Sequence, residues 1–132
     1  MSSALQIRFA GEHRGFVDFD DAAQTMLAEK VTSSSEAVPH MKRAFAQLAT
    51  ALGSLPEVNG RDGRPTVAIN RCPNRAHAGA GLDILVRTDQ ASSIDLSDIF
   101  AHSGFVKDGT APEIGMNISG VNYSAIPVAY TR

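Results

Sequence analysis

The sequence has few of the residues that mark secreted, membrane-spanning or base-stacking proteins. Its 132 residues include one cysteine, Cys72, so no disulfide can form within the chain and a reducing compartment is the default expectation. No apolar run approaches the ~18–20 residues that a transmembrane helix needs. Tryptophan is absent and aromatic residues make up 6% of the chain, which argues against a surface on which bases or sugars stack.

Charge of neither sign dominates the chain. Lysine and arginine together number 12 against 14 aspartates and glutamates, which gives a formal net charge of −2. Such a balance provides no overall attraction to nucleic acid or to an anionic membrane. The stretch from Met1 to Ala10 lacks the charged start and apolar centre of a signal peptide. We therefore expect a cytoplasmic or particle-associated protein that does not bind membranes.

The common motifs of catalysis and metal binding are also missing. The four histidines fall in four different segments: His13, His40, His77 and His102. None of them has the short spacing typical of zinc ligands, and the aspartates at 18, 20 and 21 do not match a calcium-binding loop. The chain has no Gly-x-Ser-x-Gly elbow, no P-loop and no dinucleotide-binding fingerprint. We expect no metal and no cofactor, we identify no catalytic residue, and we favour a protein that is not an enzyme.

One stretch has a strong helical period, and the predicted fold is built around it. Between Ser34 and Leu55, apolar residues recur at spacings of three and four, which places them on one face of a helix. They are Val38, Met41, Phe45, Leu48, Leu52 and Leu55. Pro39 is tolerated only in a first turn, so the regular helix should begin at about Val38, and Gly53 followed by Pro56 should end it.

Segments on both sides of this helix alternate in the manner of β-strands. Residues 5–10 and 16–19 are separated by a short polar turn and predict a hairpin, and residues 66–69 and 82–86 predict two further strands. Shorter helices are predicted at residues 22–30 and 93–100. Strands and helices are segregated along the chain, which indicates an α+β fold in a single domain over residues 1–132. We expect a mainly antiparallel sheet of four to six strands, packed on one long helix plus one or two short helices.

The C-terminal part of the chain is strand-like and lacks charge. Glu113 and Arg132 bracket this stretch, and no charged residue lies between them. A change of alternation at Gly120 indicates a β-bulge. Because charges normally keep an edge strand from pairing with another chain, we expect this segment to be paired, either centrally in its own sheet or with a second copy. The predicted interface residues are Ile114, Met116, Ile118, Val121, Tyr123, Ile126, Val128 and Tyr130.

A polar loop at residues 70–81 is the second candidate site. It lies between two apolar strands, and its candidate ligand-binding residues are Arg71, Asn74, Arg75 and His77. Gly79 and Gly81 would let backbone amides approach a ligand, so the loop could cradle a phosphate or carboxylate. Polar residues are also expected in any exposed connection, which is the plainer interpretation of the same residues.

Three functions remain compatible with these patterns. The first, which we favour, is a non-enzymatic structural, assembly or interaction protein, such as a viral or phage particle component, whose partner is itself through a sheet edge or the C-terminal strands. The second is a small ligand- or anion-binding domain or enzyme that uses the 70–81 loop, together with Asp83. The third is a nucleic-acid binder that contacts phosphates through Arg61, Arg64, Arg71 and Arg75. The net negative charge places nucleic acid last.

Overall fold

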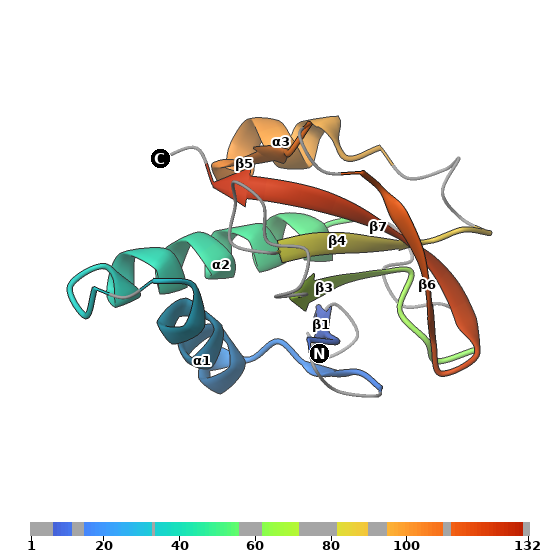
Figure 1. Cartoon of the computed structure of the whole chain (residues 1–132), viewed down its shortest axis with the longest axis horizontal. Helices are drawn as coiled ribbons and strands as arrows, with labels where there is room; N and C mark the ends of the chain where they lie inside the picture. The colour runs from blue at the N-terminus through green and yellow to red at the C-terminus, as the bar shows by residue number, and fades with distance from the viewer. Residues whose placement is uncertain are drawn as a thin grey trace.

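The computed structural model describes residues 7–11, 15–32, 34–55, 62–71, 82–89, 95–109 and 112–130. Within these ranges the chain forms three helices: α1 (Asp21–Val31), α2 (Val38–Gly53) and α3 (Ser97–Ser103). The same ranges contain seven strands: β1 (Arg8–Phe9), β2 (Val17–Asp18), β3 (Val67–Arg71), β4 (Leu82–Arg87), β5 (Phe105–Lys107), β6 (Ile114–Ile118) and β7 (Val121–Tyr130). All of these strands join in one sheet (Figure 1), so the predicted α+β class is confirmed.

The sheet is mainly antiparallel, as the sequence predicts. Its strand order is β2-β1-β3-β4-β7-β5, and β6 pairs with the same side of β7 as β5 does. Among the described strands, β1 and β3 are the one parallel pair, with Arg8 opposite Ala68. The strand that the sequence does not predict is β5, whose three residues are too few to show an alternating pattern.

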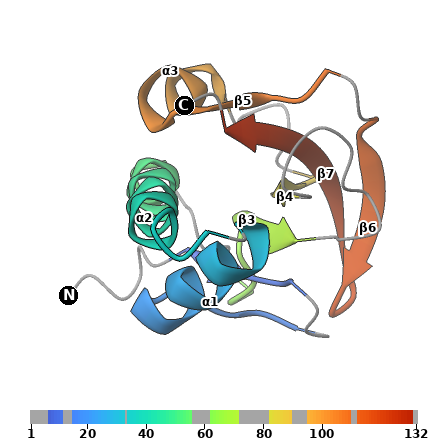
Figure 2. The ribbon, with the colours of Figure 1, turned by 60° about the vertical axis from the view of Figure 1, so that its left-hand side comes forward.

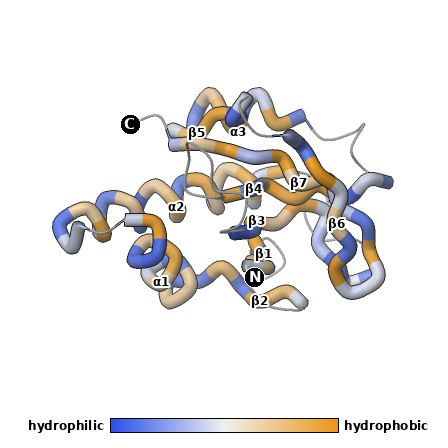
Figure 3. The backbone as a smooth tube through the Cα atoms, in the orientation of Figure 1, coloured by the Kyte–Doolittle hydropathy of each residue, from blue (hydrophilic) through white to orange (hydrophobic). Residues whose placement is uncertain are grey.

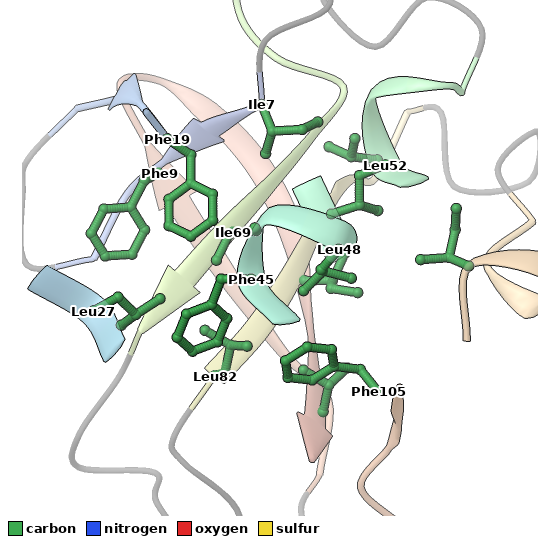
Figure 4. Close-up of a cluster of buried hydrophobic side chains, with 14 of the residues drawn as sticks. Ile7, Phe9, Phe19, Leu27, Phe45, Leu48, Leu52, Ile69, Leu82 and Phe105 are labelled. Carbon is green, nitrogen blue, oxygen red and sulfur yellow. The ribbon is translucent and has the colours of Figure 1, made fainter. Parts of the chain in front are cut away.

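The long helix α2 covers one face of the sheet and carries the main core. It begins at Val38 with Pro39 in its first turn and ends at Gly53, as predicted. Phe45, Leu48 and Leu52 on its inner face are fully buried (Figure 4). The ring of Phe45 stacks on that of Phe105 with centroids 5.9 Å apart, and it meets the ring of Phe19 edge-on at 6.3 Å. These contacts join the N-terminal and C-terminal parts of the chain in one core.

A capping hydrogen bond fixes the start of α1, and a glycine in a left-handed conformation fixes the end of α3. The carboxylate of Asp20 accepts a hydrogen bond from the backbone N–H of Ala23 at 3.0 Å, which caps the start of α1. Gly104 ends α3 with a φ of +78°, a left-handed conformation that glycine adopts without strain.

Along α1 and α2, hydrophilic positions interrupt the hydrophobic ones at regular intervals (Figure 3), as expected for helices buried on one side. Of the helices described, none combines the length and the apolar character that a membrane crossing requires.

The sheet buries side chains on both faces. The three helices lie on one face (Figure 2), and the opposite face carries a second apolar cluster. This helix-free cluster consists of Ala10, Ala68, Leu85, Ile118, Val121, Tyr123 and Ala125, with Phe16 and Met116 against it. The rings of Phe16 and Tyr123 meet edge-on with centroids 5.6 Å apart, so the chain before β2 folds over this face. A strand buried on both faces needs apolar side chains throughout, which explains why β4 and β7 alternate imperfectly.

The C-terminal strands form a hairpin. Ser119 and Gly120 have φ values of +54° and +86°, and they join Ile118 of β6 to the opposite residue Val121 of β7. Positive φ at both positions is the type I′ turn that suits the twist of two antiparallel strands. The β-bulge predicted at Gly120 is therefore wrong, because the change of alternation there reflects a chain reversal. The two strands of this hairpin, β6 and β7, have different environments.

Candidate functional site

The longest strand, β7, lies in the interior of the sheet. It pairs with β4 through Tyr123–Val128 on one side, and with β6 through Val121–Ala125 and β5 through Val128–Tyr130 on the other. It is thus paired on both sides within the chain, which is one of the two arrangements expected for the tail. The outer edge of this half of the sheet is consequently formed by β5 and β6.

The eight predicted interface residues are divided between the two strands of the hairpin. On β7, Tyr123 and Val128 are 0% and 2% exposed and Val121 is also buried, so the chain's own cores enclose them. Ile126 and Tyr130 are half-buried against the core under the helices. On β6, Ile118 is buried, Met116 is half-buried and Ile114 is 37% exposed. Of the eight predicted interface residues, only Ile114 on β6 is exposed, and the other seven are buried or half-buried.

Hydrogen bonds of β7 define which way the backbone groups of this region point. The C=O of Asn122 accepts from the N–H of Thr88, next to β4, at 3.1 Å, and the C=O of Pro127 accepts from the N–H of Asp108, next to β5, at 2.9 Å. The N–H and C=O of one strand residue point to the same side, and this side alternates along the strand. Even-numbered residues of β7 therefore face β4, and odd-numbered ones face β5 and β6.

The backbone N–H and C=O groups of β6 therefore alternate between facing β7 and facing away from the sheet. Opposite the odd-numbered residues of β7 lie Ile114, Met116 and Ile118, whose N–H and C=O groups consequently face β7. Gly115 and Asn117 direct their N–H and C=O groups outward. Within the described part of the chain no backbone group lies in position to pair with them, and both residues are exposed. Figures 1 and 2 place β6 on the opposite side of the molecule from α2, so this helix does not cover the strand.

Charge distinguishes β6 from the other outer strands. At the far edge of the sheet, β2 has two residues and ends at Asp18, whose carboxylate lies 3.2 Å from Nε of Arg8. On the near edge, β5 ends at Lys107, which forms an ion pair with Glu113. From Ile114 to Ile118, by contrast, β6 has no charged residue. Charge and short length are the usual protection of an edge strand, and β6 lacks the first of these.

The two strands that flank the predicted 70–81 loop place a buried polar pair next to it, Asn70 on β3 and Asp83 on β4. Arg71 is the last residue of β3 and is half-buried, whereas Asn74, Arg75 and His77 lie outside the described residues. At the base of the loop Asn70 lies opposite Asp83, and the two are 1% and 2% exposed. The sequence marks these positions only as polar residues within otherwise apolar strands.

The Asn70–Asp83 pair is rich in hydrogen-bond acceptors. Nδ2 of Asn70 donates to Oδ2 of Asp83 at 3.2 Å and lies 3.8 Å from the sulfur of Met116. Oδ1 of Asn70 is buried and accepts no hydrogen bond from any described group. Carboxylate and carbonyl oxygens do not attract an anion, so this pair supplies no part of the predicted phosphate or carboxylate cradle.

Shifted pKa values in the described residues have structural causes. Arg87 places Nη1 at 2.9 and 3.1 Å from the two carboxylate oxygens of Asp62, and this contact lowers the pKa of Asp62. Hydrogen bonds from Ser97 lower the pKa of Asp95. Burial raises the pKa of Tyr123 to about 12. These pKa shifts therefore arise from hydrogen bonds to exposed carboxylates and from the burial of a core side chain.

A shallow groove lies between the start of α1 and the second half of α2. Its volume is about 610 Å³, and Phe19, Asp20, Asp21 and small residues of α2 are among its lining. Asp20 is already engaged as the cap of α1, and Asp21 lies 2.7 Å from Nζ of Lys42. Both carboxylates thus have structural partners. Among the described residues no group of three or more His, Cys, Asp and Glu side chains could hold a metal ion.

Comparison with other proteins assigns no family to the chain. No known family model, curated protein or solved structure matches it. The evidence on function is therefore the geometry of the β6 edge and of the buried Asn70–Asp83 pair.

Proposed function

We propose that the protein is a non-enzymatic, self-associating structural protein whose copies join through the outer edge of β6. The observation that carries this proposal is an uncharged five-residue strand with outward backbone groups and an exposed isoleucine at its start. An edge of this kind is a template for adding a strand from another molecule. Strand addition would satisfy the N–H and C=O groups of Gly115 and Asn117 and cover Ile114.

The alternatives have less support from the described residues. The described base of the 70–81 loop is the Asn70–Asp83 pair, whose oxygens are hydrogen-bond acceptors. Such a pair favours a group that donates hydrogen bonds over an anion. A nucleic-acid surface would need several unpaired cations, yet Arg87 and Arg64 both lie near the carboxylate of Asp62. Self-association needs no further group, because the β6 backbone supplies the interaction.

The setting that we propose is a repeating assembly, such as the shell of a viral or phage particle. Each copy in such an assembly must present a surface that fits other copies, and a sheet edge does so through the main chain. By analogy, the composition of the strands and the geometry of the β6 edge suit a subunit of such an assembly.

A pair of matched substitutions tests the proposal. Ile114 and Val106 are apolar residues of similar exposure, 37% and 39%, on two strands of the same edge. Ile114→Lys would place a charge on β6, and two copies of this charge would disfavour pairing there. We expect the wild-type protein at micromolar concentration to have an oligomeric mass by light scattering, Ile114→Lys to be monomeric, and Val106→Lys to remain oligomeric. A wild-type monomer, or equal loss in both variants, would contradict the proposal.

A further inference from the structure

We infer that the partner of β6 is the same strand of a second copy, paired antiparallel about a two-fold axis that passes next to Met116. The inference rests on the proposed self-association and specifies its register. It begins from the alternation of the β6 backbone, in which Gly115 and Asn117 face outward and the residue between them faces β7.

The outward groups of β6 are complementary to themselves. A two-fold axis at Met116 brings Gly115 opposite the partner's Asn117, and the reverse pair follows by symmetry. Each such pair can exchange both N–H···O=C bonds, because all four groups of the pair point toward the junction. Met116 then faces the partner's Met116 as a pair without mutual backbone bonds, since its own N–H and C=O are directed at β7.

Other registers use less of the strand. A shift by one residue would place outward groups opposite groups that already face β7, so the ladder could not form. A shift by two residues keeps the direction of the groups but slides the end of the strand past its partner. In one direction the shift brings Glu113, which is held by Lys107, into the junction, and in the other it brings Ser119 of the turn opposite Gly115. The register centred on Met116 aligns each of the five residues of β6 with a residue of the partner's β6.

The side chains favour the same register. Ile114, Met116 and Ile118 lie on the helix-free face, opposite members of the helix-free cluster. In the two-fold pair, Ile114 lies opposite the partner's Ile118 and loses its exposure. The helix-free cluster then continues across the axis from one copy to the other. A two-fold axis repeats every charge of the strand at the same junction, where like charges repel, and β6 carries none.

Cysteine cross-linking tests the register directly. In a Cys72→Ser background, Met116→Cys puts the thiols on residues that face each other at the axis. Cα atoms of such a pair lie about 4.5 Å apart, within the usual range for a disulfide. Gly115→Cys is the matched control, because its partner in this register is residue 117 and because a Cβ at Gly115 meets no atom within 4 Å. We expect mild oxidation to produce a covalent dimer of Met116→Cys and no covalent dimer of Gly115→Cys.

A second pair of variants covers the case in which Met116→Cys does not fold. Ile114→Cys mixed with Ile118→Cys should form a covalent heterodimer, and neither variant alone should form a dimer. Cross-linking of Gly115→Cys but not of Met116→Cys, while Ile114→Lys still dissociates the wild-type oligomer, would overturn the register and leave self-association standing. Wild-type protein that is monomeric at every concentration, with no cross-link in any variant, would overturn both.

Discussion

Tyr123 shows how a single residue connects the helix-free face of the sheet to its β6 edge. Among the described side chains it is the largest that is fully buried, and it lies opposite Met116 of β6. Its hydroxyl donates a 2.7 Å hydrogen bond to the carbonyl of Pro65, and its ring meets that of Phe16. Burial of the hydroxyl disfavours the phenolate and raises the pKa to about 12 from 10.0.

Tyr123→Phe should change both the stability and its dependence on pH. At neutral pH the variant leaves the Pro65 carbonyl without its donor, which costs about 1–2 kcal/mol. Between about pH 10 and 12 the unfolded tyrosine has lost its proton while the folded one keeps it, so the folded state binds more protons and wild-type stability falls as pH rises. The phenylalanine variant lacks this contribution.

The measurement is urea unfolding of both proteins at a series of pH values. We expect the advantage of the wild type to be largest at neutral pH and to shrink through the interval from pH 10 to 12. If the difference between the two proteins stayed constant over that interval, the tyrosine would not have the raised pKa.

At the scale of an element, the β6–β7 turn decides whether β6 exists as a separate strand. The side chain of Asn117 supports the turn: Oδ1 accepts from the N–H of Gly120 at 3.2 Å, and Nδ2 donates to Oδ1 of Asn122 at 2.9 Å. Gly120 has a φ of +86°, and a Cβ there would meet no atom within 4 Å. The requirement for glycine therefore comes from the backbone conformation alone.

Gly120→Ala should destabilise the protein by about 1 kcal/mol, because alanine pays for the left-handed conformation that glycine adopts freely. Gly109→Ala is the control, since a Cβ at Gly109 also meets open space but φ there is not positive. Thermal or urea unfolding should show the loss in the first variant and no loss, or a small gain, in the second. Equal effects in both variants would mean that the turn is not the cause.

Features with a local cause could be predicted from the sequence, and features with a distant cause could not. The Asp20 cap, Pro39 in the first turn of α2 and Gly104 after α3 each act on neighbouring residues, so the sequence shows them directly. The parallel pairing of Arg8 with Ala68 joins residues far apart in the chain, and no spacing in the sequence encodes it. At Gly120 a turn and a bulge change the alternation in the same way, and the sequence does not separate them.

The candidate site was predictable as a segment but not as an edge. Both β6 and β7 read as apolar and uncharged, yet β7 is covered by β4 on one side whereas β6 has no described strand beyond it. Which strand keeps an unpaired edge depends on the order of the strands in the sheet. Asn70 is an opposite case, because one polar residue in a strand normally indicates a side chain in solvent, whereas here it is 1% exposed beside Asp83. Burial of such a residue becomes visible only with the assembled sheet.

At the scale of the whole molecule, the two edges of the sheet differ in their capacity to grow. The β2 edge is two residues long and carries Asp18, and the β6 edge is longer and uncharged. A two-fold pairing uses the same strand of both copies, so the interface closes on itself and yields a dimer. A larger assembly would then be built from dimers and would need a second, different contact.

A dimer of this kind makes thermal stability depend on protein concentration. Because dimerisation stabilises only the folded chain, each tenfold increase in concentration should raise the unfolding midpoint of the wild type by about 2–3 °C, given the entropy of unfolding expected for two chains of this length. Ile114→Lys should keep one midpoint at all concentrations, since it has no dimer to lose, while Val106→Lys should follow the wild type. Differential scanning calorimetry over a hundredfold range of concentration measures this. A wild-type midpoint that did not move over this range would show that no such dimer forms, and it would contradict the proposed pairing of β6.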